Sequence, residues 1–236
     1  MTNSSIVTFR RTDVVSQCME DAAKKIADHF KIRRTHIPDF CSMLLNSKRW
    51  NINNLSQKLN RWISMFGRLS GTQGLISIVE NAFLACQNDN DIHNLRGIML
   101  EALLIGTNGG SAILNDLNCG WGAKVYVNNN VIRYHCRSNP KPYSDCADRA
   151  TVDLGIWNGN HGRFYECKVH PNSLRCKEIK YMDALSSKLQ SHNISHEIFF
   201  VSADSLDEVK IKLLEMNADS SYKPIGYHEL AGFLSA

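Results

Sequence analysis

Asp153, Glu166 and Lys168 are the residues of this chain whose types and spacing best suit metal-ion chemistry. Residues 151–156 alternate apolar with polar or small side chains, the period-two pattern of a half-buried strand. After a turn rich in asparagine and glycine, residues 164–170 alternate in the same way. Glu166 and Lys168 are two positions apart, so a strand points both to the same face.

The length of the turn decides whether Asp153 joins that pair. A two-residue loop at Gly159-Asn160 is a favoured hairpin turn and sets Asp153 opposite Glu166, with Cβ atoms about 5 Å apart. If the loop is Asn160-His161 instead, Asp153 still points to the same face of the sheet and lies opposite Lys168. A three-residue loop without a bulge would break the arrangement.

Two carboxylates and an ammonium group on one sheet surface suit a hard divalent cation. Mg²⁺ prefers oxygen ligands, usually one or two carboxylates completed by phosphate oxygens and water. A lysine beside such an ion can orient or deprotonate an attacking water and stabilise charge on the phosphate. The alternative is a strand whose surface Asp, Glu and Lys form only a solvated ion pair, which stabilises little.

Asp153, twelve residues, and then Glu166-Cys167-Lys168 on a predicted strand pair form a pattern that resembles the restriction-endonuclease-like, or PD-(D/E)XK, nucleases. The resemblance implies that Asp153 and Glu166 bind Mg²⁺, for which Mn²⁺ can substitute. It also implies that Cys167 lends its main-chain carbonyl to the metal and that Lys168 assists the nucleophilic water. Residues 95–203 carry the match, which is one of topology and motif.

Glu101 is the fourth candidate for this site, and Val152 is a departure from the family pattern. Family members usually have a proline before the Asp, but many share the departure that Val152 makes here. The helical neighbours of Glu101 are apolar, and a buried charge without a partner is expensive. In the resembling family, a helix before the first strand often supplies an acidic residue to the metal site. The alternative for Glu101 is an edge position where it pairs with a lysine.

The predicted order of elements from the second half of the chain is that of an α/β sandwich. It runs helix, three antiparallel strands, helix, strand, helix, and it matches the restriction-endonuclease-like core, a mixed sheet flanked by helices. The first hairpin is expected around three asparagines, with residues 123–127 and 131–136 as its strands. A helix over about 174–192, a strand over 197–203, a helix capped by Ser205 or Asp207 and a closing strand and helix over 227–234 follow.

Residues 12–88 are predicted to be helical throughout, which gives two domains, 1–90 and 91–236. Helices are expected from Asp13 to about residue 30, after Pro38, from Asn54 to residue 69, and from Ser70 or Thr72. The segment 87–94 is a plausible hinge, and Asp91 is expected to begin the next helix. Trp50 and Trp62 fall within this helical part, and they fit core positions better than base-stacking platforms.

The helical part also carries a concentration of positive charge. Residues 24–68 contain ten Lys and Arg residues, opposed only by Asp28 and Asp39, whereas residues 101–236 are close to neutral. Such a block is the electrostatic footprint of a protein that binds polyanions, although a solvated helical surface would look the same. The predicted nucleic-acid-binding residues are Lys24, Lys25, Arg33, Arg34, Lys48, Arg49, Lys58 and Arg61.

Two further segments hold alternative sites. The loop 138–150 is a candidate DNA-contacting or metal-proximal loop, and its Asp148 is the fallback metal ligand should the strand assignment shift. Its other polar candidates are Lys141, Asp145 and Arg149. Eight scattered cysteines without a C-X-X-C pair indicate reduced thiols rather than disulfides or zinc. Cys136 and Cys146 with His135 or His161 would form an alternative metal site.

The sequence and the resemblance together indicate a Mg²⁺-dependent endonuclease that acts on DNA, with RNA as another substrate. The chain has no apolar run near 18 residues and no signal-peptide core, so we expect a cytoplasmic protein without a membrane partner. A homodimer is expected if both strands are cut. A bacterial restriction or anti-phage role follows by analogy. The alternatives are a non-catalytic nucleic-acid-binding protein and a ligand-gated nuclease with a helical sensor.

Overall fold

The structure is a computed structural model that describes residues 6–136 and 148–232. Its centre is a seven-stranded mixed sheet in the order β1-β2-β4-β5-β6-β7, with the short β3 also paired to β2. Strands β1 to β5 pair antiparallel, whereas β6 lies parallel to β5 and β7 parallel to β6. The strands are β1 (Val7–Arg11), β2 (Cys119–Val127), β3 (Asn130–Val131), β4 (Thr151–Trp157), β5 (His161–Lys168), β6 (Ser195–Ser202) and β7 (Lys223–Ile225).

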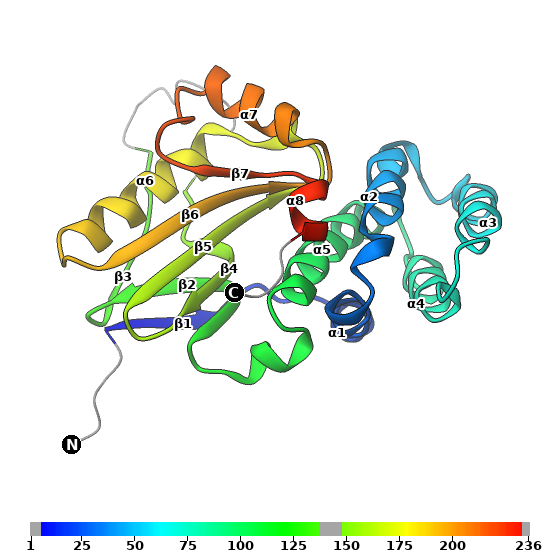
Figure 1. The fold of residues 1–236 in the computed structure, drawn as a ribbon, viewed down its shortest axis with the longest axis horizontal. Helices are drawn as coiled ribbons and strands as arrows, with labels where there is room; N and C mark the ends of the chain where they lie inside the picture. The colour runs from blue at the N-terminus through cyan, green and yellow to red at the C-terminus, as the bar shows by residue number, and fades with distance from the viewer. Residues whose placement is uncertain (1–5, 137–147, 233–236) are drawn as a thin grey trace.

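Helices cover both faces of the sheet (Figure 1). On one face α5 packs against β4 and β5, with α1 against α5 and the remaining N-terminal helices beyond it. On the other face α6 and α7 pack against β6. The α-helices are α1 (Gln17–Ile32), α2 (Ile37–Asn46), α3 (Leu55–Phe66), α4 (Gln73–Leu84), α5 (Asp89–Thr107), α6 (Cys176–Gln190), α7 (Leu206–Glu215) and α8 (Tyr227–Gly232). The expected α/β class, a mixed sheet flanked by helices, is confirmed.

Each face of the sheet has its own hydrophobic core. Leu154, Tyr165 and Val201 point into a core that continues through α5 into α1 to α4. Val152 and Phe164 belong to the second core, which the apolar sides of α6 and α7 complete. The first core therefore joins the sheet to the N-terminal helices without a break. The domain boundary predicted near residue 90 stays a prediction.

Several helix ends follow their capping residues. The Ser205 hydroxyl accepts a hydrogen bond from the Glu208 N–H at 3.3 Å, so the predicted cap of α7 is confirmed. Helix α5 begins at Asp89, two residues before the predicted start at Asp91. The Asn88 side chain accepts from the Asp91 N–H at 3.0 Å, and this contact places the cap at Asn88.

The strands differ from the sequence predictions in two places: one strand was missed, and one was predicted too long. The N-terminal strand β1 was not predicted, because its partner β2 lies more than a hundred residues away and alternation alone does not reveal it. The second strand of the first hairpin, predicted over 131–136, shrinks to β3. The same edge of β2 pairs with β4 from Lys124 back to Cys119, and Lys124 lies opposite Thr151.

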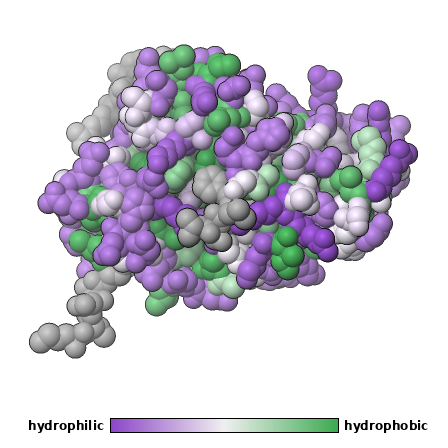
Figure 2. Space-filling view, in the orientation of Figure 1, coloured by the Kyte–Doolittle hydropathy of each residue, from purple (hydrophilic) through white to green (hydrophobic). Residues whose placement is uncertain are grey.

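The visible face of the molecule is mainly hydrophilic, with small hydrophobic patches between (Figure 2). Within the described ranges, none of the helices combines the length and apolar character needed to cross a membrane. The described cysteines are free thiols, and Cys41, Cys86 and Cys167 are buried.

Candidate functional site

The hairpin of β4 and β5 places the candidate ligands in the register expected from the two-residue loop. Leu154 lies opposite Tyr165, and Asp153 and Glu166 are the next residue of each strand beyond this last pair. The Asn158 N–H donates to the His161 carbonyl at 3.2 Å, and Gly159 between them has a φ of 98°. A residue with a side chain rarely adopts that backbone conformation, so glycine suits the turn.

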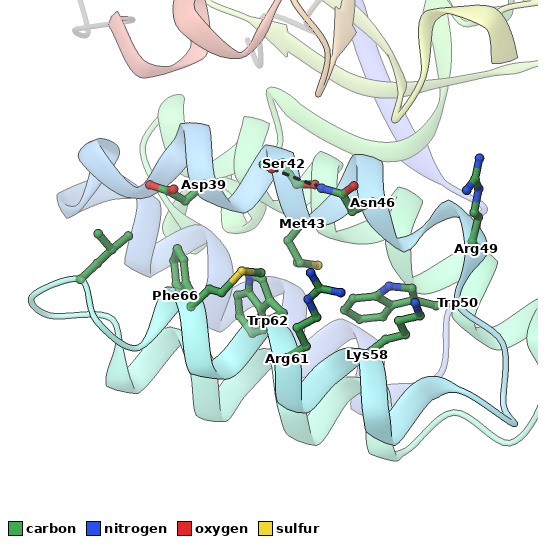
Figure 3. A pocket seen from close by; sticks show the side chains of 12 residues that line it. Asp39, Ser42, Met43, Asn46, Arg49, Trp50, Lys58, Arg61, Trp62 and Phe66 are labelled. Carbon is green, nitrogen blue, oxygen red and sulfur yellow. Dashed lines mark hydrogen bonds between the residues drawn. The ribbon is translucent and has the colours of Figure 1, made fainter.

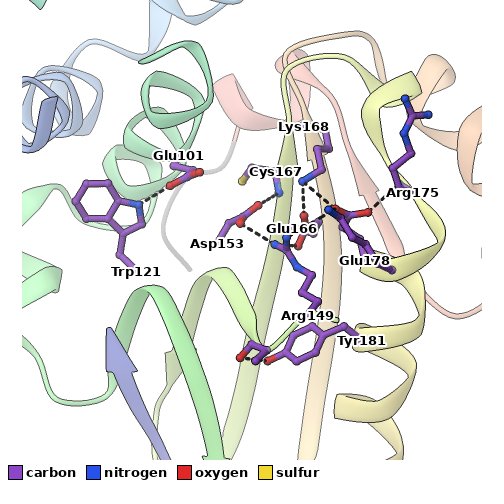
Figure 4. A network of polar contacts seen from close by, with 12 residues as sticks. Glu101, Trp121, Arg149, Asp153, Glu166, Cys167, Lys168, Arg175, Glu178 and Tyr181 are labelled. Atoms are coloured by element: carbon purple, nitrogen blue, oxygen red, sulfur yellow. Dashed lines mark hydrogen bonds and ion pairs between the residues drawn. The ribbon is translucent and has the colours of Figure 1, made fainter. Parts of the chain in front are cut away.

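A single guanidinium nitrogen joins the two carboxylates (Figure 4). Nη2 of Arg149 lies 3.0 Å from Asp153 Oδ1 and 2.7 Å from Glu166 Oε2. Nζ of Lys168 lies 2.5 Å from the other oxygen of Glu166. Glu166 is fully buried, and Asp153 exposes 8% of its surface. The structure thus brings Asp153, Glu166 and Lys168 together, and it adds Arg149 between the carboxylates.

The neighbouring strand fixes the orientation of the Asp153 carboxylate. Its Oδ2 atom accepts a hydrogen bond from the backbone N–H of Cys167 at 2.6 Å. The Cys167 thiol belongs to the core on the α5 side, which leaves the main chain of this residue at the site. The role predicted for the Cys167 carbonyl stays a prediction.

Glu178 is a member of the network that the sequence analysis missed. It is 2% exposed on α6, and its Oε1 atom lies 3.6 Å from Lys168 Nζ and 3.7 Å from Arg149 Nη1. Its other oxygen accepts from the backbone N–H of Arg175 at 2.9 Å. This contact is half of a capping box at the start of α6. The sequence signal available was that Glu178 lies three residues after the helix cap. This spacing predicts a capping contact but not a position in the candidate site.

Glu101 reaches the site from α5, and its hydrogen-bond donor is an indole rather than a lysine. Nε1 of Trp121 lies 2.5 Å from Glu101 Oε2 (Figure 4). Burial, followed by the charge of Asp153, raises the pKa of Glu101 to about 8, although the Trp121 hydrogen bond lowers it. Protonated and ionised forms of Glu101 are therefore both accessible near neutral pH.

A cavity of about 560 Å³ opens beside the network, between the sheet and the N-terminal helices. Asp153, Lys168 and Glu101 line it, whereas Glu166 lies behind Lys168 in a smaller hollow. The other residues that line the 560 Å³ cavity come from the segment before α1, the start of α1, the first half of α5, and the end of β5 with the residues that follow it. They include Ser16, Met19, His93, Arg96, Cys167 and His170.

Burial and charge pull the pKa values of this network in opposite directions. Burial and the charge of Asp153 raise the pKa of Glu166 to about 7, despite the cations of Lys168 and Arg149 beside it. Burial alone would lower the pKa of Lys168, but the carboxylates of Glu166 and Asp153 outweigh it and raise that pKa well above its ordinary value. Lys168 is therefore a cation at neutral pH.

The alternative metal sites are not assembled in the described ranges. Residues 6–136 and 148–232 contain no group of three or more His, Cys, Asp or Glu side chains placed to hold a metal ion, either at these alternative sites or around Asp153 and Glu166. Asp148, the fallback ligand, forms an exposed ion pair with His135 at 3.2 Å. Cys146 of the alternative cysteine site lies outside the described residues, as do Lys141 and Asp145 of the loop.

The eight predicted nucleic-acid-binding residues differ in their surroundings. Lys24 pairs with Glu20 of the same helix, α1, at 2.8 Å, and Arg34 donates to the Thr107 carbonyl of α5 at 2.9 Å, so both have partners within the protein. Lys25, Arg33 and Lys48 are exposed. Only three of the eight share a cavity, and those are Arg49, Lys58 and Arg61.

Comparisons with known proteins add little to this geometry. No protein-family model matches the chain, and no curated protein matches it significantly. Among solved structures, the chain is similar to protein VC1899 from Vibrio cholerae, with 12% sequence identity and a TM-score of 0.44. The match covers 97% of this chain but only 57% of the longer VC1899 chain. A likeness at this TM-score carries no argument, so function must be argued from the site.

Proposed function

We propose that this protein is a Mg²⁺-dependent endonuclease that hydrolyses phosphodiester bonds of DNA. The observation that carries the proposal is the shared contact of Asp153 and Glu166 with one nitrogen of Arg149, beside the Lys168 ammonium. The order α5, β2, β4, β5, α6, β6 also agrees with the restriction-endonuclease-like core that the motif implies. Motif and element order are independent features, so their agreement supports the proposal more than either alone.

The residues of the site fit Mg²⁺. The Arg149 nitrogen occupies a position where a cation contacts both carboxylates, so a positive charge is already favoured there. Mg²⁺ usually needs only one or two carboxylates, with substrate phosphate and water completing its octahedron. Asp153 and Glu166 would supply the carboxylates, with Glu101 and the Cys167 carbonyl as further ligands. When bound, the ion would polarise the scissile phosphate and lower the pKa of a water.

Lys168 has a defined role in this proposal. Its raised pKa keeps the amine protonated at neutral pH, so it orients the attacking water and stabilises negative charge on the phosphate rather than removing a proton. Glu166 and Glu178 hold the ammonium from two sides, which fixes its position at the edge of the cavity. Arg96 adds a positive charge to the wall of the same cavity, where a phosphate backbone would pass, whereas burial lowers the pKa of His170 and leaves its imidazole neutral at pH 7.

A non-catalytic nucleic-acid-binding protein is the second candidate. It is favoured by Arg149 itself, because a guanidinium that neutralises both carboxylates can make the network purely structural. The nuclease proposal also includes a biological context. A homodimer would let two copies cut both strands of a duplex. A restriction or anti-phage role would suit such an enzyme. Regulation by the helical part would make the same nuclease ligand-gated.

Cleavage assays separate the two candidates. Supercoiled plasmid, linear DNA and RNA are incubated with the protein, with and without Mg²⁺. We expect Mg²⁺-dependent cleavage that Lys168→Ala lowers by roughly 100-fold or more while DNA binding is retained. Lys180→Ala, which removes an exposed lysine of α6 paired only with Asp183, is the matched control and should cleave normally. Binding without cleavage by the intact protein, with either Mg²⁺ or Mn²⁺, would establish the non-catalytic candidate instead.

A further inference from the structure

A second cavity, of about 530 Å³, lies in the N-terminal helices between α2 and α3 (Figure 3). This volume falls in the range of small-ligand sites. We refer to it as the α2–α3 groove. It is lined by Asp39, Ser42, Met43, Asn46, Arg49, Trp50, Lys58, Arg61, Trp62, Met65, Phe66 and Leu69. The catalytic proposal uses none of these residues.

The wall of the α2–α3 groove is aromatic and rigid. Trp62 stacks on Phe66 with ring centroids 4.9 Å apart, and Trp50 packs against Phe83 at 5.0 Å. The two tryptophans expose only 6% and 9% of their surfaces, so their rings are held in place by the core. Within the described part of the chain, neither indole N–H has a hydrogen-bond partner. Both donors are therefore available to a ligand that presents acceptors.

The rim of the groove is cationic. Arg49, Lys58 and Arg61 line it, and none of the three forms an ion pair with a described residue, unlike Lys24 on α1. Asp39 is the one carboxylate among the lining residues. Arg61 and Lys58 extend from α3 beside the two indoles (Figure 3). Flat apolar rings beside unpaired cations are complementary to a planar group attached to a phosphate.

Helix α2 separates this groove from the catalytic cavity. Arg96, which lines the catalytic cavity, donates to Ser47 Oγ at 2.8 Å and to the Leu44 carbonyl at 3.0 Å, at the end of α2. Met43, next to Leu44, faces the α2–α3 groove. Lys48 is exposed and lies in the chain between Ser47, which binds Arg96, and Arg49, which lines the α2–α3 groove. Lys48 and Arg49 thus place two cations between the two cavities.

We propose that the α2–α3 groove binds unpaired nucleotides of a single-stranded nucleic acid whose chain continues over Lys48 to the catalytic cavity. This inference rests on the proposed function and names its substrate class, a strand with a single-stranded tract. Bases in a duplex are stacked and paired, so they cannot reach buried indoles, whereas unpaired bases can. The phosphates between such bases meet the rim cations.

Binding measurements in EDTA test this inference without requiring cleavage. The probes are a labelled single-stranded oligodeoxythymidine of roughly twelve nucleotides and a blunt duplex of the same length. We expect tighter binding of the single strand. Arg61→Ala and Lys58→Ala should each weaken it about fivefold and lower the salt slope by about 0.7, the loss of one phosphate contact. Lys210→Ala, which removes an exposed lysine of α7 that lines neither cavity, is the matched control and should change neither value.

Tryptophan fluorescence reports on the groove directly. The single strand should quench the emission of the protein, and Trp62→Phe, which keeps an aromatic ring in the core, should remove part of that quenching. Equal affinity for the blunt duplex would overturn the inference, as would a loss of affinity in Arg61→Ala no larger than that in Lys210→Ala. Thymidine monophosphate that binds the groove as tightly as the strand would also overturn it, because the site would then be one for free nucleotides.

Failure of this inference is distinguishable from failure of the proposed function. Groove-dependent binding of the single strand, with no cleavage when Mg²⁺ is added, would uphold the inference and refute the nuclease. Cleavage of both probes at rates that Arg61→Ala and Lys58→Ala leave unchanged would uphold the nuclease and refute the inference.

Discussion

Arg149 has a larger part in the candidate site than its position beside a loop suggests. It contacts Asp153 and Glu166, and its pKa is raised above its ordinary value because those carboxylates outweigh burial. Its Nε atom is buried without a hydrogen-bond partner among the described residues. Both carboxylates bind Arg149 through its Nη2 atom, and a divalent cation could take the place of this nitrogen, so we expect Arg149 and Mg²⁺ to compete.

Substituting Arg149 tests that competition. Arg149→Met should destabilise the protein by about 3 kcal/mol in EDTA, because it leaves buried carboxylates without their partner. Mg²⁺ should then raise the melting temperature of the variant more than that of the unmodified protein. Thermal unfolding with EDTA and with Mg²⁺ measures both effects, and Arg133→Met, at an exposed arginine, is the control. A variant that Mg²⁺ stabilises no more than the unmodified protein would show that the two cations do not share a position.

Glu101 provides a pH-dependent prediction. Its pKa, about 8, is higher in the folded protein than the ordinary value of 4.5, so the folded state binds this proton more tightly than the unfolded state. The stability that the proton contributes is complete below pH 4.5 and is lost as the pH rises through 8. Glu101→Gln keeps an acceptor for Trp121 and does not titrate. Its stability relative to the unmodified protein should therefore increase by about 1 kcal/mol or more from pH 5 to pH 8.

Denaturant unfolding in EDTA at a series of pH values measures that difference. His93→Gln, at an exposed histidine on the rim of the same cavity, is the control for a substitution near the site. If the free energies of unfolding of Glu101→Gln and the unmodified protein change with pH in parallel, Glu101 is ionised across the whole range.

At the scale of elements, strand β1 is fixed by its Phe9 ring. Gly120 of β2 and Gly155 of β4 lie opposite each other, and the Phe9 side chain packs over both. A Cβ added at Gly155 would lie 2.3 Å from the Phe9 ring, and one added at Gly120 would lie 2.6 Å from Phe9 Cβ. The two glycines thus make the space that lets β1 lie on the sheet.

Filling this space should therefore destabilise the sheet. Gly155→Ala is expected to lower the free energy of unfolding by about 1 to 3 kcal/mol, because the core is overpacked. Phe9→Leu in the same chain should restore part of the loss. Gly97→Ala on α5, where an added Cβ meets nothing within 4 Å, should stabilise instead, by the helix propensity of alanine. A Gly155→Ala protein as stable as the unmodified one, by denaturant unfolding, would mean that β1 is not held at Phe9.

Sequence patterns predicted the local elements and failed where the partner is distant. The hairpin of β4 and β5 was predictable because its turn residues and its alternation lie within twenty residues, and they set the register at Asp153 and Glu166. Strand β1 pairs with a strand about half the chain away, and Glu178 reaches the site from another element, so no local pattern identified them. The roles predicted for Asp153, Glu166 and Lys168 remain part of the proposed function.

At the scale of the whole molecule, the candidate site lies where the sheet meets the N-terminal helices. The segment before α1, the first half of α5 and the end of β5 all line its cavity, so both parts of the chain build it. The basic character of residues 24–68 was visible in the sequence, but its distribution was not. Lys24 pairs within α1 and Arg34 binds a main-chain carbonyl of α5, whereas Arg49, Lys58 and Arg61 lie together at the α2–α3 groove.

The central claim is that Asp153 and Glu166 hold one divalent cation. Titration with Mn²⁺ followed by electron paramagnetic resonance tests it most directly, because Mn²⁺ prefers the same oxygen ligands as Mg²⁺. The account predicts one saturable site per chain that Mg²⁺ displaces, that Asp153→Asn and Glu166→Gln each remove, and that Asp148→Asn leaves intact. No saturable binding, or binding that survives Asp153→Asn, would contradict it.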